Sequence, residues 1–199
     1  GPGGTGYFSR SKELPVCIAK AVTQRSNPIY EAAFGRQAFS MVNLLPEAAM
    51  HDAIKGIAPR QFLDLNYRHP LVIIKFKKES EVDDGIPKNV LMRALSADRD
   101  CHMAIIVDED IDIYDPWAVW MAMVTRTDWK TGFFIVPSAR GHGVVPVARE
   151  QAGIVDKVAI DTTMPFGMRE KFLTNQFVPV DVTRFIPNFV PRPWYEHGG

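Results

Sequence analysis

Hydrophobic runs of strand length alternate with apolar segments of helical period along the middle of the chain. Three helical segments are expected, at residues 46–56, 86–95 and 116–126. A strand that feeds a helix is half of a crossover unit, so the pattern predicts an α/β protein. The strand-length runs are residues 16–23, 62–67, 71–76, 104–107, 133–136 and 158–160.

The stretch IIVDEDIDIYDPWAVWMAMVTR, from residue 105 to residue 126, contains the clearest of these units. Residues 104–107 are apolar without interruption, as in strands that are buried on both faces of a sheet. Asp115 before Pro116 predicts a helix start, because the aspartate side chain accepts hydrogen bonds from free backbone amides and proline has no amide to lose. The helix is expected to end near Arg126.

Between this strand and this helix lie four acidic residues: Asp108, Glu109, Asp110 and Asp112. Carboxylates in such a row can bind a hard cation, which would allow a metal-dependent hydrolase built on the three aspartates. The row lacks the glycine and the distant glutamate of a calcium loop. Its alternation with Ile111 and Ile113 favours acids that cap the helix while the isoleucines enter the core.

Composition narrows the class of protein. With 199 residues, of which 46% are hydrophobic, the chain can bury a core. Lys+Arg and Asp+Glu number 23 each, which argues against charge-driven binding to nucleic acid or to an anionic membrane. Cys17 and Cys101 have neither disulfide nor zinc spacing, and no apolar run approaches the roughly 20 residues of a membrane span. We therefore expect a soluble, cytoplasmic protein.

Glycine and proline mark both ends of the chain. The start, GPGGTGYFSRSKELP, has no methionine and is interpreted as a segment that enters from something upstream or as a processed end. Residues 177–199 carry prolines at positions 179, 187, 191 and 193, which predict an extended arm rather than a helix.

Taken in order, four pieces of the chain resemble the later part of the UbiD-type decarboxylase family, which uses prenylated FMN to add or remove carbon dioxide on aromatic and unsaturated acids. The resemblance covers most of residues 1–170 and depends on the order and spacing of the pieces. They are GPGGTGY at residues 1–7, VTQRSNPIY at 22–30, VDEDIDIYDPWAVWMAMVTR at 107–126 and DKVAIDTT at 156–163.

The resemblance implies a division of the chain and of the chemistry. Residues 1–35 would be the trailing segment of a flavin-binding split-barrel domain, residues 36–176 a C-terminal α/β domain with a mixed sheet flanked by helices, and residues 177–199 a proline-rich tail. Prenylated FMN, a divalent metal and, as a further candidate ion, K⁺ would be bound mainly upstream of this chain or by a partner chain. The family's catalytic acid-base residues also lie there, so the isolated chain is expected to be inactive.

The same resemblance suggests the residues that would contact substrate. The loop ARGHGVVP, residues 139–146, is similar to a family loop that faces the bound acid, so that Arg140 and His142 would meet polar groups and Val144 would form an apolar wall. His142 could protonate or hydrogen-bond a polar ring substituent, since the usual histidine pKa is near 6.5; an exposed histidine without a role is the alternative. A looser match places Met41 and Val42 at the pocket. Some relatives have a lysine before the strand at Ala104 that reaches the flavin phosphate. This chain departs from that pattern, with Ser96 at the equivalent position and Arg93 and Arg99 nearby, so the resemblance assigns no cofactor-binding residue here.

The sequence leaves three functions open. The first prediction is a C-terminal part or subunit of a (de)carboxylase for an aromatic, phenolic or α,β-unsaturated carboxylic acid. It would close the substrate pocket, pair with an upstream catalytic chain and form a homo-oligomer. The second is a structural or assembly subunit without a cofactor of its own. The metal-dependent hydrolase is the third.

Overall fold

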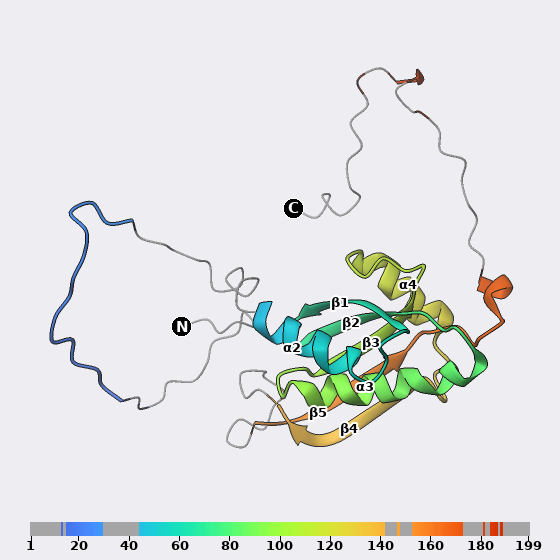
Figure 1. Ribbon diagram of the computed structural model, residues 1–199, viewed down its shortest axis with the longest axis horizontal. Helices are drawn as coiled ribbons and strands as arrows, with labels where there is room; N and C mark the ends of the chain where they lie inside the picture. The colour runs from blue at the N-terminus through green and yellow to red at the C-terminus, as the bar shows by residue number, and fades with distance from the viewer. Residues whose placement is uncertain are drawn as a thin grey trace.

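A five-stranded mixed sheet forms the centre of the fold (Figure 1). The structure is a computed structural model that describes residues 13, 15–29, 44–141, 147, 153–172, 181, 184–186 and 188. Strands β2, β3 and β5 are parallel to one another, while β1 and β4 run antiparallel at the two edges. The order across the sheet is β1 (Phe62–Arg68), β2 (Leu71–Phe76), β3 (Met103–Asp108), β5 (Ile154–Asp161) and β4 (Phe133–Arg140).

Helices cover both faces of this sheet. On one face, α2 (Leu44–Lys55) and α3 (Ile86–Ala97) share a hydrophobic core with the strands, and on the other face α4 (Pro116–Arg126) does so (Figure 1). Short 3₁₀ helices, η1 (Glu81–Gly85) and η2 (Arg169–Phe172), complete the described elements. The predicted α/β class with helices flanking a mixed sheet is confirmed.

The alternation of side chains along β3 explains why its sequence is apolar throughout. Ala104 and Ile106 enter the core under α2 and α3, whereas Ile105 and Val107 enter the core under α4, and all four are buried. A strand covered on both faces has no polar side. Full burial of one such aliphatic side chain stabilises the fold by roughly 1.5–3 kcal/mol.

The start of α4 follows the sequence prediction. The Asp115 side chain accepts a hydrogen bond from the Trp117 amide at 2.9 Å, and Pro116 occupies the first turn. Ile113 is buried and Ile111 packs beside the same core. The acidic turn therefore sends its isoleucines inward, as the alternation indicated.

Two sequence expectations need correction. Residues 16–23 were expected as a strand, but residues 15–29 form no strand and are exposed, and none of the described strands pairs with them. Strand β4 is longer than expected and includes residues 138–140, which the sequence placed in a loop. It tolerates Pro137 because the register shifts between Val136 and Ala139, where Ser138 has a φ of 54°.

Among the described residues, no helix combines the length and the apolar character needed to cross a bilayer.

Candidate functional site

The direction of the strands places the sequence-predicted residues at two opposite edges of the sheet. The parallel strands end at Phe76, Asp108 and Asp161, which defines a carboxyl edge. Strand β4 runs the other way, and its last residue, Arg140, pairs with Ile154 at the start of β5. Arg140 and the loop that follows it therefore begin at the amino edge, a strand's length away from the acidic turn.

A hollow of about 320 Å³ lies beside the amino edge, between α3 and β4. It brings together the substrate candidate Arg140 with Ser96 and Arg99, which are distant from it in sequence and lie where some relatives have a phosphate-binding lysine. Arg93, which is near them in sequence, is not part of this lining. The lining consists of Met92, Leu95, Ser96, Arg99, Val136, Ala139, Arg140 and Lys157.

Lys157 is a buried cation that the sequence analysis did not identify. Its ammonium group donates hydrogen bonds to the carbonyl oxygens of Leu95 at 2.6 Å and Asp98 at 3.2 Å, at the end of α3. Burial lowers the pKa of Lys157. The signal in the sequence was a lone lysine within the apolar strand β5, VDKVAID, which requires acceptors wherever it is buried.

The charge of this hollow suits an anion. Arg99 and Arg140 are exposed, and Lys157 adds a third positive charge behind them. Arg99 Nε lies 3.2 Å from Asp100 Oδ1 in a surface ion pair. Guanidinium groups bind carboxylates and phosphates through several hydrogen bonds, so this donor set fits either the phosphate of a flavin or the carboxylate of an acid.

The remaining predicted substrate residues lie outside the described residues: Met41, Val42, His142 and Val144. Their roles stay predictions. Gly141, at the end of β4, is described, and its amide donates a hydrogen bond to the Gly153 carbonyl at 2.8 Å. A side chain at Gly141 would clash with Val155 and would come within 2.8 Å of His102 Nε2. Packing therefore requires glycine where the chain leaves the strand at the amino edge.

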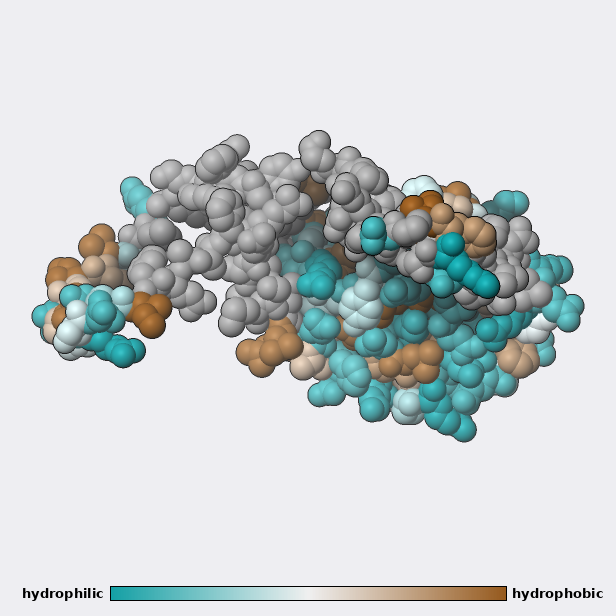
Figure 2. Space-filling view, turned by 90° about the horizontal axis from the view of Figure 1, so that it is seen from above, coloured by the Kyte–Doolittle hydropathy of each residue, from teal (hydrophilic) through white to brown (hydrophobic). Residues whose placement is uncertain are grey.

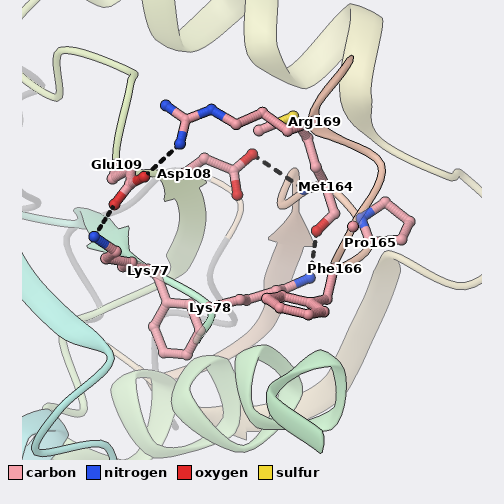
Figure 3. Close-up of a pocket in the computed structure, with 10 residues that line it drawn as sticks. Lys77, Lys78, Asp108, Glu109, Met164, Pro165, Phe166 and Arg169 are labelled. Carbon is pink, nitrogen blue, oxygen red and sulfur yellow. Dashed lines mark hydrogen bonds and ion pairs between the residues drawn. The ribbon is translucent and has the colours of Figure 1, made fainter. Parts of the chain in front are cut away.

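The carboxyl edge holds a second pocket, of about 260 Å³, which Figure 3 shows. Asp108 accepts a hydrogen bond from the Met164 amide at 3.0 Å, and Lys78 donates to the Met164 carbonyl at 2.7 Å. These contacts fix the segment after β5 over the ends of β2 and β3. The pocket is lined by Phe76, Lys77, Lys78, Asp108, Glu109, Met164, Pro165, Phe166, Gly167 and Arg169.

Beneath this pocket, Arg126 neutralises the acidic turn. Its guanidinium contacts Asp108 at 3.1 Å and forms two hydrogen bonds with Asp110, at 2.9 and 2.8 Å. The hydrogen bond with Arg126 lowers the pKa of Asp110, whereas burial raises the pKa of Asp108 to about 6, against the opposing effect of the Met164 amide and Arg126. The sequence analysis identified Arg126 only as the end of a helix. The neighbouring residues in the sequence do not indicate that the helix brings Arg126 next to the acids at the end of β3.

The metal-dependent hydrolase does not agree with this geometry. Within the part of the chain that the structure describes, no group of three His, Cys, Asp or Glu side chains is arranged to hold a metal ion. Asp108 and Asp110 bind Arg126, and Asp112 accepts a hydrogen bond from the Tyr114 amide at 2.9 Å. The three aspartates stabilise the turn instead.

Comparison with known proteins agrees with the fold and with the resemblance. Residues 37–162 match the family model of the 3-octaprenyl-4-hydroxybenzoate carboxy-lyase C-terminal domain. A gallate decarboxylase of Lactiplantibacillus plantarum is 30% identical over 84% of this chain and 37% of its own length. A phenolic acid decarboxylase of Bacillus subtilis is 29% identical over 81% of this chain and 35% of its own length.

Solved structures give the same result. The 3,4-dihydroxybenzoic acid decarboxylase of Klebsiella pneumoniae superposes with a TM-score of 0.68 and 27% identity, over 78% of this chain and 34% of that chain. The vanillic acid decarboxylase of Sedimentibacter hydroxybenzoicus superposes with a TM-score of 0.52 and 26% identity, over 68% of this chain and 29% of that chain. The chain thus spans about a third of the length of these relatives.

The α/β domain is that of a carboxy-lyase C-terminal domain. The chain belongs to the UbiD family of decarboxylases, of which it carries the C-terminal portion.

Proposed function

We propose that this chain is the C-terminal part of a prenylated-FMN-dependent (de)carboxylase that acts on an aromatic acid such as a phenolic acid, or on an α,β-unsaturated carboxylic acid. The observation that supports this most directly is the amino-edge hollow, where Arg99, Arg140 and Lys157 gather around one space. This hollow adjoins the start of the loop whose sequence resembles the family's substrate-facing loop. Relatives in the comparisons are named for gallate, phenolic acids and vanillic acid, all of them ring carboxylates.

In this role the chain binds and orients rather than performs the bond-breaking step. When bound, prenylated FMN supplies the chemistry of carbon dioxide loss or addition, and we place it mainly on the upstream part or on a partner chain. Arg99 and Ser96 would hold an anionic group of the flavin, and Arg140 would orient the carboxylate of the substrate. Closing this side of the pocket also excludes water, which strengthens each of these charged contacts.

The exposed segment at residues 15–29 supports a partner domain outside the described fold. Its apolar side chains are more than 80% exposed, an arrangement that normally requires cover. In Figure 1 this segment lies apart from the sheet, and Figure 2 shows its apolar side chains in brown at the far left. We assign residues 1–35 to the flavin-binding domain. The exposed apolar residues are Val16, Ile18, Val22 and Ile29.

A structural or assembly subunit is the second candidate function. One exposed face of α4 favours it, since helical spacing aligns apolar side chains there that are 43–71% exposed. Such a face fits contact with another copy of the chain. The residues are Trp117, Trp120, Met121 and Val124.

The experiment that tests the proposal compares Arg140→Ala with Lys130→Ala in the decarboxylase assembled with its flavin-binding part. Loss of a charge-assisted hydrogen bond should lower kcat/KM for 3,4-dihydroxybenzoate or gallate by about 10- to 100-fold in Arg140→Ala. Lys130 is exposed and lies outside both pockets, so its variant should retain wild-type kinetics.

Two results would decide against the proposal. Unchanged kinetics in Arg140→Ala would remove the orienting role of this residue. Native mass spectrometry that detects a flavin-free homo-oligomer, with no decarboxylation of any ring acid by the assembled protein, would favour the assembly subunit.

A further inference from the structure

The mouth of the carboxyl-edge pocket contains one carboxylate held between two cations (Figure 3). Lys77 Nζ lies 3.2 Å from Glu109 Oε2, and Arg169 Nη1 lies 2.9 Å from Glu109 Oε1. This pocket lies at the opposite edge from Arg140, so an inference from it does not rest on the proposed function. The arrangement shows that Lys77 and Arg169 are placed to grip a carboxylate group from two sides.

The deeper charged groups of the pocket are already paired with other protein groups, so they offer few interactions to a ligand. Lys78 is 8% exposed and contacts both the Met164 carbonyl, at 2.7 Å, and Asp84, at 2.8 Å. Asp108 is 9% exposed and is held by the Met164 amide and Arg126. These groups form a fixed floor.

The two cations at the mouth of the pocket, unlike the buried Lys78 and Asp108, are exposed to solvent. The side chains of Lys77 and Arg169 are 50% and 65% exposed, so their ion pairs with Glu109 are surface pairs, which contribute little to stability. At the mouth itself two cations face one carboxylate, which leaves an excess of one positive charge there. An incoming anion can therefore share or replace Glu109 at little cost.

Beside the cations, the wall of the pocket is apolar. Phe76 is fully buried at the end of β2, and Met164 is 9% exposed above it. Phe166, at 45% exposure, presents its ring to the opening, next to Pro165. The volume of about 260 Å³ accommodates a single ring with one charged substituent. The carboxyl ends of parallel strands are also the usual place for ligands in α/β sheets.

We propose that the carboxyl-edge pocket binds a small carboxylate with an apolar, ring-sized body. Lys77 and Arg169 bind its carboxylate in the position of the Glu109 side chain, and Phe166 with Met164 covers its ring. This site is separate from the amino-edge hollow, and it binds the same chemical class of ligand, a ring with a carboxylate.

The test is a titration of the 199-residue chain with benzoate, followed by NMR through the backbone amides. Saturable shifts are expected at Lys78, Glu109 and Phe166, and acetate, which lacks a ring, should produce much weaker ones. Lys77→Ala with Arg169→Ala should abolish the shifts. Glu109→Gln removes the internal competitor and should tighten benzoate binding about three- to fivefold, a gain that damage to the fold cannot imitate.

Arg140→Ala serves as the matched control, since it removes a cation at the other edge. It should leave benzoate binding at the carboxyl edge unchanged. The inference is overturned if benzoate shifts no amide around the pocket, or if Glu109→Gln weakens binding. It is also overturned if Arg140→Ala removes the shifts while the double variant keeps them, a result that would still support the proposed function.

Discussion

Asp108 is a carboxyl group that the fold buries at the end of β3 and surrounds with donors. Burial raises its pKa to about 6, because the charged form loses water and the Met164 amide with Arg126 only partly replaces it. The folded state therefore holds a proton on Asp108 more tightly than the unfolded state does. This contribution to stability is fully present below the unfolded pKa near 4 and is lost as the pH rises through 6.

Replacing Asp108 with Asn, which does not titrate, should make this pH dependence measurable. The free energy of unfolding of the wild type minus that of Asp108→Asn should fall by about 2 kcal/mol between pH 4 and pH 7. Urea denaturation at a series of pH values gives both quantities. A difference that rises with pH would mean that the ion pair with Arg126 outweighs burial.

At the scale of elements, strand and helix periods identified most of the fold. The strands expected at residues 62–67, 71–76, 104–107, 133–136 and 158–160 are present, since each carries the apolar residues that its faces bury. Residues 16–23 have the same composition but form no strand, because a strand needs a partner that sequence period does not reveal. The period of apolar residues thus predicts which side chains a segment can bury, but it does not predict which strand the segment pairs with.

The cap at Asp115 allows a test at this scale. Asp115→Ala removes the acceptor for the Trp117 amide and should lower the free energy of unfolding by about 1 kcal/mol. Asp115→Asn keeps an acceptor in place and is expected to stay close to the wild type. Thermal or urea unfolding of both variants measures the difference, and an equal loss in the two would show that charge rather than capping is responsible.

At the scale of the molecule, the sheet places two sets of charged residues at opposite edges. The sequence did not predict which residue belongs to which edge. Sequence reasoning predicted Arg140 through family resemblance and noted Ser96 and Arg99 only as a departure from a family lysine, and the fold brings the three to one hollow. It missed Lys77 and Arg169, because their shared contact with Glu109 joins segments far apart in the chain. Such contacts depend on the topology of the fold, and no periodic pattern in the sequence predicts them.

The exposed residues 15–29 lead to a prediction for the assembled protein. In the isolated 199-residue chain, their amides should exchange hydrogen at nearly unprotected rates. In the assembly with the flavin-binding domain, pairing with its sheet should slow that exchange by at least about 100-fold. Hydrogen exchange with mass spectrometry compares the two states, and equal rates would remove these residues from the interface.

Strand β4 forms the outer border of the sheet, where backbone donors and acceptors face solvent. Unprotected borders recruit strands from other molecules and lead to aggregation. Pro137 lacks a donor, and the displaced register with a left-handed Ser138 bends the strand at the same place. A foreign strand would find no continuous row of partners there, so this interruption opposes edge-to-edge pairing with other molecules.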